Sequence, residues 1–267
     1  MTRIHIDRKP ELDLFQNILE GRRTERILLV EAPPGRGKTL LLMEYQKMAV
    51  QAGVPCAALD LRTGSLGIHD VLAAMPEEWG WKHFPTFRHS VEGMLRPAAE
   101  VTVSGILQIG RPQVRVVPGQ EEREVRRWRQ RTLTDALFQD LGTWLGSTGR
   151  AILFVDTYNP EGDPQTVEPE LQEWLEGVFL GHARRCTGLV VVIAGQKAPS
   201  PNIAWERCCH RLYLAPLDNP DDWMDLVRVL DLKLSRRDVS LVCRLYRGEP
   251  LGIATGLGKL RDWGGSQ

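Results

Sequence analysis

The chain has 267 residues, of which 42% are hydrophobic and 25% charged, and its basic and acidic side chains balance to a formal net charge of zero. This length and composition are ordinary for a globular protein with one large domain, or one domain and a small appendage. The neutral balance excludes a global attraction to nucleic acid or to an anionic membrane, although a local basic patch stays compatible with it.

The cysteines and the apolar segments of the sequence indicate the cellular compartment of the protein. The chain has five cysteines, an odd number, and no Cys-x-x-Cys pair, which disfavours a disulfide framework or a zinc site. Its first residues lack the apolar run of a signal peptide, and no stretch approaches the ~18 apolar residues of a membrane helix. We therefore expect a cytoplasmic protein without membrane contact.

The N-terminal part predicts a strand–loop–helix–strand unit after an amphipathic helix. That first helix is expected to be capped by Asp7 and to reach about Glu20. The apolar run Arg26–Glu31 indicates a buried strand, Lys38–Ala52 a helix and Pro55–Leu61 a second strand. Such a unit predicts a parallel sheet with a right-handed crossover.

Residues 62–120 have the weakest pattern and are expected to form an irregular insertion. Within them, Ile68–Met75 fits a short helix and Trp79–Phe87 an aromatic loop. Val101–Val117 alternates weakly between apolar and polar residues and contains glycines and a proline, which predicts a hairpin. A long helix is then expected over Glu122–Leu145.

The remaining core elements alternate between strand and helix. A third strand, a helix, a fourth strand and a short fifth strand are expected, in this order, at Ala151–Val155, Leu171–Ala183, Leu189–Ala194 and Arg211–Leu214. Sequential strands with helices between them favour helices on both faces of a parallel sheet.

Beyond Leu217 the pattern is helical only. One helix is expected from Asp218 to Leu230, a capping box at Ser235 opens a second, and Pro250 opens the last. A boundary near Pro216 would divide the chain into an α/β core, residues 1–216, and a small helical lid, residues 217–267.

The turn after the first strand carries a phosphate-binding motif. Ala32-Pro-Pro-Gly-Arg-Gly-Lys38-Thr39 follows the pattern Gly-x4-Gly-Lys-[Ser/Thr], with Ala32 in place of the first glycine. Glycines let backbone amides point at a β-phosphate, and the helix that begins at Lys38 adds its positive end. The Lys38 ammonium would reach the β/γ oxygens, and the Thr39 hydroxyl would bind Mg²⁺. An incidental Gly/Pro-rich turn is the alternative.

These features predict the fold class and the ligand contacts. The fold class is α/β, a three-layer P-loop NTPase with a parallel central sheet and a small C-terminal helical lid. The predicted nucleotide contacts are Pro34, Gly35, Arg36, Gly37, Lys38, Thr39 and Leu40. ATP is preferred to GTP because the chain has no Asn/Thr-Lys-x-Asp guanine motif.

Asp156 ends the third expected strand and is the candidate second metal ligand. A carboxylate at the C-terminal end of a parallel strand faces the same crevice as the phosphate loop and would hold the water shell of the Mg²⁺. A turn or helix-cap aspartate is the alternative. Thr157 follows where many ATPases have a catalytic glutamate, which puts rapid hydrolysis in doubt. Substitute bases would be Glu161, Asp163 or Asp60, each of which also fits an ordinary turn residue.

Gln196 follows the fourth strand and is the candidate sensor of the γ-phosphate, completing a catalytic set with Lys38 and Asp156. An exposed turn amide is the alternative. A basic run on the long helix also fits several roles: a solvated face paired with glutamates, an arginine that completes a neighbour's nucleotide site, or a nucleic-acid contact. Its members are Arg123, Arg126, Arg127, Arg129 and Arg131.

Taken in order, the motifs resemble the STAND branch of AAA+-like P-loop ATPases, the class with NACHT and NB-ARC switches. VEAPPGRGKT resembles the Walker A segment, AILFVDTY the Walker B strand, and VVVIAGQ the sensor-1 strand. Asp7-Arg8-Lys-Pro-Glu-Leu resembles the opening helix, and RGEPLGIA the Gly-x-Pro segment of the lid. The resemblance implies an ASCE/AAA+-like core and adds Arg8 and Pro250 to the nucleotide contacts, with the proline ring on the adenine.

Two departures from that class qualify what it implies. The second Walker B acid is absent, and no room remains after the lid for a winged helix and sensor repeats. We therefore expect a minimal member, a fragment, or a partner of an effector on another chain. The expected function is an ATP/ADP- and Mg²⁺-dependent switch with slow or conditional ATP hydrolysis, in microbial signalling or defence and often oligomeric. A loader or remodeller acting on DNA or protein, and a non-hydrolysing scaffold, are the alternatives.

Overall fold

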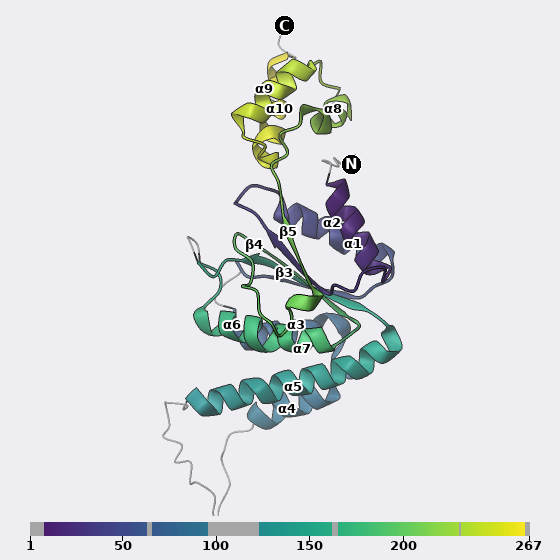
Figure 1. Ribbon diagram of the computed structural model, residues 1–267, viewed down its shortest axis with the longest axis vertical. Coiled ribbons are helices and arrows are strands. Elements are labelled where there is room, and N and C mark those ends of the chain that lie inside the picture. Colours follow the sequence, from purple (N-terminus) through teal and green to yellow (C-terminus); the bar gives the residue numbers. More distant parts are fainter. Residues whose placement is uncertain (1–7, 63–65, 96–122, 162–164, 230, 265–267) are drawn as a thin grey trace, which may run out of the picture.

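The structure is a computed structural model that describes residues 8–62, 66–95, 123–161, 165–229 and 231–264. It consists of a central sheet with helices on both faces and a small group of helices beyond one end of the sheet (Figure 1). The predicted three-layer α/β class with an all-parallel sheet is confirmed.

Five parallel strands form the sheet in the order β2-β3-β4-β1-β5. They are β1 (Ile27–Glu31), β2 (Cys56–Asp60), β3 (Ala151–Tyr158), β4 (Leu189–Gly195) and β5 (Cys209–Tyr213). Ile27 of β1 lies opposite Val191 of β4 on one side and Cys209 of β5 on the other. The strands with two neighbours are apolar runs because both of their faces are buried.

The helices cover the two faces of the sheet unequally. One face is covered by α1 (Lys9–Leu19) and α2 (Lys38–Gln51), and it receives Leu28 and Val30 of β1. The alternate residues Ile27 and Leu29 belong to the larger cluster on the other face. That face is covered by α3 (Ile68–Trp79), α5 (Arg123–Thr148), α6 (Pro169–Trp174), a π-helical turn (Leu175–Phe179) and α7 (Leu180–Arg185).

The expected aromatic loop at Trp79–Phe87 is wrong. The chain there ends α3, makes a short 3-10 helix at Trp81–His83, and begins α4 (Pro85–Leu95), which runs along α5 (Figure 1). The aromatic residues are core rather than loop: Trp79 stacks on Trp144 of α5 with ring centroids 5.1 Å apart, and Phe84 and Phe87 are buried. Part of the insertion is therefore regular helix, and the expected hairpin lies outside the described residues.

Other boundaries differ from expectation for local reasons. Arg8, not Asp7, precedes the first turn of α1, and Asp7 lies outside the described residues. β3 continues past Asp156 to Tyr158, because an irregularity between Val155 and Tyr158 lets the strand resume its pairing with β4. The single helix expected at 171–183 begins earlier, ends at Arg185 and contains the π-helical turn.

Three helices make up the C-terminal part: α8 (Pro220–Val229), α9 (Arg236–Leu245) and α10 (Pro250–Gly264). They share an apolar cluster that includes Trp223, Val239 and Ile253. The capping box at Ser235 is present, with Asp238 as its acidic partner. We call α8–α10 the lid; the division of the chain at residue 216 stays a prediction. No helix among the described residues has the length and apolarity to cross a membrane.

Candidate functional site: the phosphate loop and the lid corner

The segment between β1 and α2 is a tight loop rather than an extended connection. Gly35 and Gly37 have φ angles of +77° and +84°, a conformation that side-chain-bearing residues rarely adopt. Gly37 is the N-cap of α2, so the unpaired amides at the start of that helix face the loop. The loop therefore has the backbone geometry that an anion-binding site at a helix N-terminus requires.

Ala32 is accommodated where the motif usually has glycine. Its backbone does not have a positive φ, so a Cβ causes no strain there. Its amide donates to the Gly195 carbonyl of β4 at 3.2 Å, and its methyl group is buried. Ala32 thus extends the pairing with β4 by one residue beyond β1, before the loop turns.

The Lys38 side chain lies over the loop that precedes it. Its Nζ donates to the carbonyls of Ala32 at 2.6 Å and Pro33 at 2.9 Å. Partial burial lowers the pKa of Lys38, while the nearby Asp156 carboxylate opposes that shift. Lys38 and Asp156, predicted to act together, are therefore close enough to interact electrostatically.

Asp156 lies in β3 beside a second acidic residue. It is in register with Asp60 of β2, and its Oδ1 accepts a hydrogen bond of 2.7 Å from the amide of Thr157. Thr157 has a φ angle of +60°, which produces the irregularity in β3. Asp60 accepts from the Arg62 guanidinium at 2.7 Å, and this hydrogen bond lowers the pKa of Asp60. Asp60 therefore stays ionised but is engaged by Arg62.

Of the other two suggested bases, only Glu161 is among the described residues. Glu161 forms an exposed ion pair with Lys197 at 2.7 Å, and Asp163 lies outside the described residues. Neither residue is placed against the phosphate loop by a described contact.

Gln196 is held at the same end of the sheet through its backbone. Its amide donates to the Oδ1 of Asn159 at 2.8 Å, and Asn159 is a buried polar residue just after β3. The Thr166 hydroxyl in turn accepts from the Asn159 amide at 3.1 Å. Sequence reasoning missed Asn159 and Thr166; a polar residue directly after a buried strand was the available signal.

A partly buried ion pair lies at the end of β1, and it was also missed. Glu31, the last residue of β1, accepts from Arg211 of β5 at 2.9 Å and from the Ala198 amide at 3.1 Å. Both side chains of the ion pair are partly buried. Glu31 thus ties the C-terminal end of β1, from which the phosphate loop starts, to the middle of β5 and to the segment after β4.

The lid reaches the loop at the corner between α9 and α10. The Arg36 guanidinium donates to the Arg247 carbonyl at 2.8 Å. Pro250 is buried, and a Cβ placed on Gly37 would lie 3.7 Å from its Cγ. Arg8 donates to the carbonyls of Arg36 at 3.1 Å and Ala215 at 2.9 Å, joining α1, the loop and the segment before the lid. The structure therefore gathers Arg8 and Pro250, predicted from opposite ends of the chain, around one loop.

The donors at this site suit a nucleotide with a hard divalent cation. Backbone amides and Lys38 suit phosphate oxygens, and the Thr39 hydroxyl and the Asp156 carboxylate are the oxygen ligands that Mg²⁺ prefers. Thr39 and Leu40 are exposed at the start of α2, so both remain accessible. A bound Mg²⁺ would neutralise phosphate charge, and the chain's own residues would hold and orient the phosphates.

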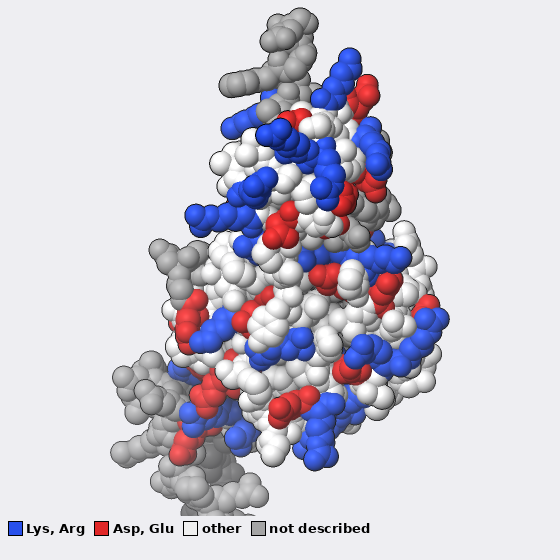
Figure 2. Space-filling model, turned by 45° about the horizontal axis from the view of Figure 1, so that its top comes forward, with Lys and Arg blue, Asp and Glu red and all other residues white. Residues whose placement is uncertain are grey.

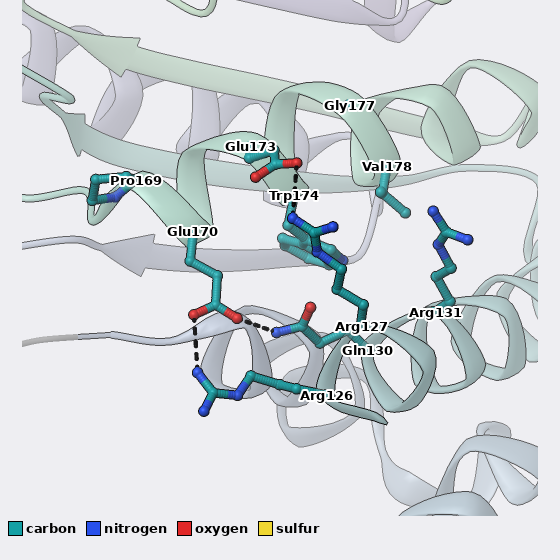
Figure 3. Close-up of a pocket in the computed structure, with 10 residues that line it drawn as sticks. All are labelled: Arg126, Arg127, Gln130, Arg131, Pro169, Glu170, Glu173, Trp174, Gly177 and Val178. Atoms are coloured by element: carbon teal, nitrogen blue, oxygen red, sulfur yellow. Dashed lines mark hydrogen bonds and ion pairs between the residues drawn. The ribbon is translucent and has the colours of Figure 1, made fainter. Parts of the chain in front are cut away.

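A separate groove lies between α5 and the α6–π-helical segment, away from the described loop contacts (Figure 3). Its volume is about 660 Å³. Arg126 and Arg127 reach across it to Glu170 and Glu173, at 3.6 and 3.9 Å. Part of the basic run is thus paired with acids, as in the solvated-face interpretation. Over the face in Figure 2, basic and acidic side chains are interspersed, with many lysines and arginines on the lid at the top.

The five-stranded parallel sheet, with a glycine-rich loop between β1 and its helix, is a fold that this chain shares with solved structures of other proteins. The sequence matches no known family profile and no curated protein.

Solved structures with the same fold include a Walker-type ATPase of Pyrococcus abyssi, with a TM-score of 0.57 at 12% identity, over 96% of this chain and 68% of that one. Cdc6p from Pyrobaculum aerophilum aligns with a TM-score of 0.50 at 12% identity, over 95% of this chain. The replication initiator DnaA bound to AMPPCP and single-stranded DNA aligns with a TM-score of 0.50 at 10% identity, over 94% of this chain. The chain spans only 61% and 60% of these last two proteins.

Proposed function

We propose that the chain is an ATP-binding switch with slow or partner-dependent hydrolysis, related to the STAND class. The observation that carries the proposal is the contact between the lid corner and the phosphate loop, through Arg36 to the Arg247 carbonyl and through Pro250 beside Gly37. A ligand in that loop touches both parts of the protein, so its phosphates would bias the position of the lid.

The proposed roles follow from position. The amides of Gly35 to Thr39, with Lys38, hold the β- and γ-phosphates, while Thr39 and Asp156 hold the Mg²⁺. Gln196, anchored by Asn159, is proposed to sense the γ-phosphate. Arg8 and Pro250 would border the base and the ribose. Slow turnover is expected because Thr157 stands where a glutamate base is common.

The direct test is nucleotide-dependent thermal stabilisation of the Lys38→Ala variant. Wild-type protein should gain about 2.7 kcal/mol of stability at an ADP·Mg²⁺ concentration of about 100 Kd, and the variant should gain none. Lys47→Ala is the matched control, because Lys47 lies on the same helix but pairs with Glu44. Equal stabilisation of the Lys38 variant and the wild type would refute the site.

A loader or remodeller acting on DNA or on a protein is the second candidate. In its favour, two similar structures are named as Cdc6p and as a replication initiator bound to single-stranded DNA. The α5 arginines would then contact nucleic acid or complete a neighbour's site. DNA-stimulated turnover together with ring formation would favour this function over the switch.

A scaffold that binds nucleotide without hydrolysing it is the third candidate. Phosphate release measured with and without a partner separates it from the other two. Thr157→Glu should raise turnover if only the base is missing, because position 157 directly follows Asp156 near the end of β3.

Assembly and location are further parts of the proposal. A homo-oligomer, or a complex with an effector on another chain in the cytoplasm, fits a switch whose output lies outside this chain. Size-exclusion chromatography with mass detection, run with ADP, with a non-hydrolysable ATP analogue and without nucleotide, tests this. A mass that depends on the nucleotide is expected, and one constant monomeric mass would contradict self-assembly.

A further inference from the structure

The lid corner places an acidic side chain on the phosphate loop. Glu249, between Gly248 and Pro250, has its carboxyl group packed against Gly35. A Cβ built on Gly35 would lie 2.6 Å from Cδ and 2.8 Å from Cγ of Glu249 and would overlap its Oε1. The only residue type that leaves room for this carboxyl group at position 35 is glycine.

The corner that carries Glu249 is built rigidly. Gly248 has a φ of +68°, and a Cβ on it would lie 2.6 Å from the Cβ of Pro216. Gly248 also accepts from the Leu217 amide at 3.0 Å, and the Glu249 amide donates to Tyr246 at 2.9 Å. Since Pro250 is buried as well, the Glu249 backbone belongs to one stiff corner and does not shift independently of it.

The surroundings of this carboxylate are those of an anion site. Among the described residues, its side chain has no hydrogen-bond or ion-pair partner, unlike the paired acids Asp221 and Asp238 of the lid. Gly35 lies in the loop that the unpaired amides at the start of α2 face, and the Lys38 ammonium donates to the Ala32 and Pro33 carbonyls of the same loop. A loop with this polarity favours negative charge whether it comes from a phosphate or from a carboxylate.

We propose that Glu249 is an internal competitor for the phosphate loop. Its carboxylate lies where it would repel the phosphates of a nucleotide and overlap the space beside Gly35 that they need. Nucleotide binding must then displace Glu249, and with it the lid corner, before the phosphates settle in the loop. This inference rests on the proposed nucleotide site and adds the means by which the lid regulates it.

The proposal makes the lid corner the moving element. Displacing Glu249 strains the Arg36–Arg247 hydrogen bond and the Arg8–Ala215 hydrogen bond, because both attach to the same corner or to the segment leading into it. Apparent nucleotide affinity is then reduced by the fraction of molecules in which the carboxylate lies on the loop. A variant that lacks the negative charge of Glu249 should therefore bind nucleotide with higher apparent affinity than the wild type.

Isothermal titration with ADP·Mg²⁺, and separately with pyrophosphate, tests this on the full chain. Glu249→Gln keeps the shape of the side chain and removes its charge. If nine molecules in ten hold the carboxylate on the loop, both ligands should bind about tenfold more tightly to this variant than to wild type. Asp225→Asn is the matched control, because it removes one acid from the same lid on α8, where Asp225 pairs with Arg228.

The outcomes separate this inference from the proposed function. If wild type, Glu249→Gln and Asp225→Asn all bind with equal affinity, the competitor role is wrong and the nucleotide site stands. Weaker binding by Glu249→Gln also overturns the inference, since it would make the carboxylate a helper. If none of these proteins binds either ligand, although melting curves show them folded, the proposed nucleotide site itself fails.

Discussion

The α/β core and the helical lid are stabilised in different ways. The core strands β3 and β4 are buried on both faces between two apolar clusters, and the phosphate loop grows directly from their neighbour β1. The lid has a small cluster of its own and is attached to the core by a few polar contacts, such as that of Arg36 with Arg247. The geometry of the loop therefore belongs to the core, while the lid is the part that we propose a ligand moves.

The largest expected loss of stability comes from replacing one large buried side chain in the apolar cluster of the lid or of the core. Trp223 of the lid and Phe154 of the core are both fully buried. Each alanine variant should cost about 3–5 kcal/mol. Phe154→Ala should lower the stability of the whole chain, whereas Trp223→Ala should melt the lid first and leave a separate core transition. Calorimetry distinguishes the two, and a single shared transition in both variants would contradict the division.

A smaller loss is expected from breaking the ion pair beneath the loop. Glu31→Gln weakens the hydrogen bonds to Arg211 and to the Ala198 amide, and it should cost about 1–3 kcal/mol by urea denaturation. Glu92→Gln is the matched control, because its pair with Arg88 is exposed and should contribute under about 1 kcal/mol. Equal losses in the two variants would show that Glu31 does not tie β1 to β5.

The lid attachment should respond more weakly still. Arg36→Ala removes the hydrogen bond to the Arg247 carbonyl and should cost about 1 kcal/mol, felt at the lid corner rather than in the sheet. Hydrogen exchange should speed up for the amides of Leu217 and Gly248 and stay unchanged in β4. Arg22→Ala, at an exposed arginine after α1, should leave both regions unchanged. Faster exchange spread evenly over the sheet would contradict the separation.

The smallest expected effect is a pH dependence from an ion pair between α1 and β1. The hydrogen bond from Arg23 lowers the pKa of Glu25 to about 2, from an ordinary value near 4.3. A lowered folded-state pKa means that this stabilisation is present above about pH 4.3 and is lost as the pH falls toward 2. Because the pair is near the surface, the loss should be at most about 1 kcal/mol. Acid titration of Glu25→Gln should lack this component; an identical acid profile would contradict the assignment.

The two parts also differ in how far their structure followed from sequence. The strands were predictable because buried parallel strands are uninterrupted apolar runs, as in Leu189–Gly195. The tight loop before α2 was predictable because its glycines and prolines, between a strand and a helix, favour a turn. By contrast, α4 was mistaken for part of an aromatic loop, because its helical face is recognisable only once Trp144 of α5 packs against the neighbouring Trp79.

Contacts between residues far apart in the chain could not be predicted from local sequence patterns. Asn159 supports the Gln196 backbone, and Glu249 meets Gly35, only because the strands and the lid bring them together. The motif at Arg247–Pro250 indicated a tight corner but not which loop it covers. Periodicity reports the face that an element buries, whereas these contacts depend on how complete elements dock.

The central claim is that the loop between Ala32 and Thr39 binds the phosphates of a nucleotide. A crystal structure of the chain with ADP and Mg²⁺ tests it most directly. The account predicts the β-phosphate on the amides of Gly35 to Thr39, with Lys38 turned toward it and the metal near Thr39 and Asp156. A nucleotide seated in the groove between α5 and α6, with the loop and Glu249 undisturbed, would contradict it.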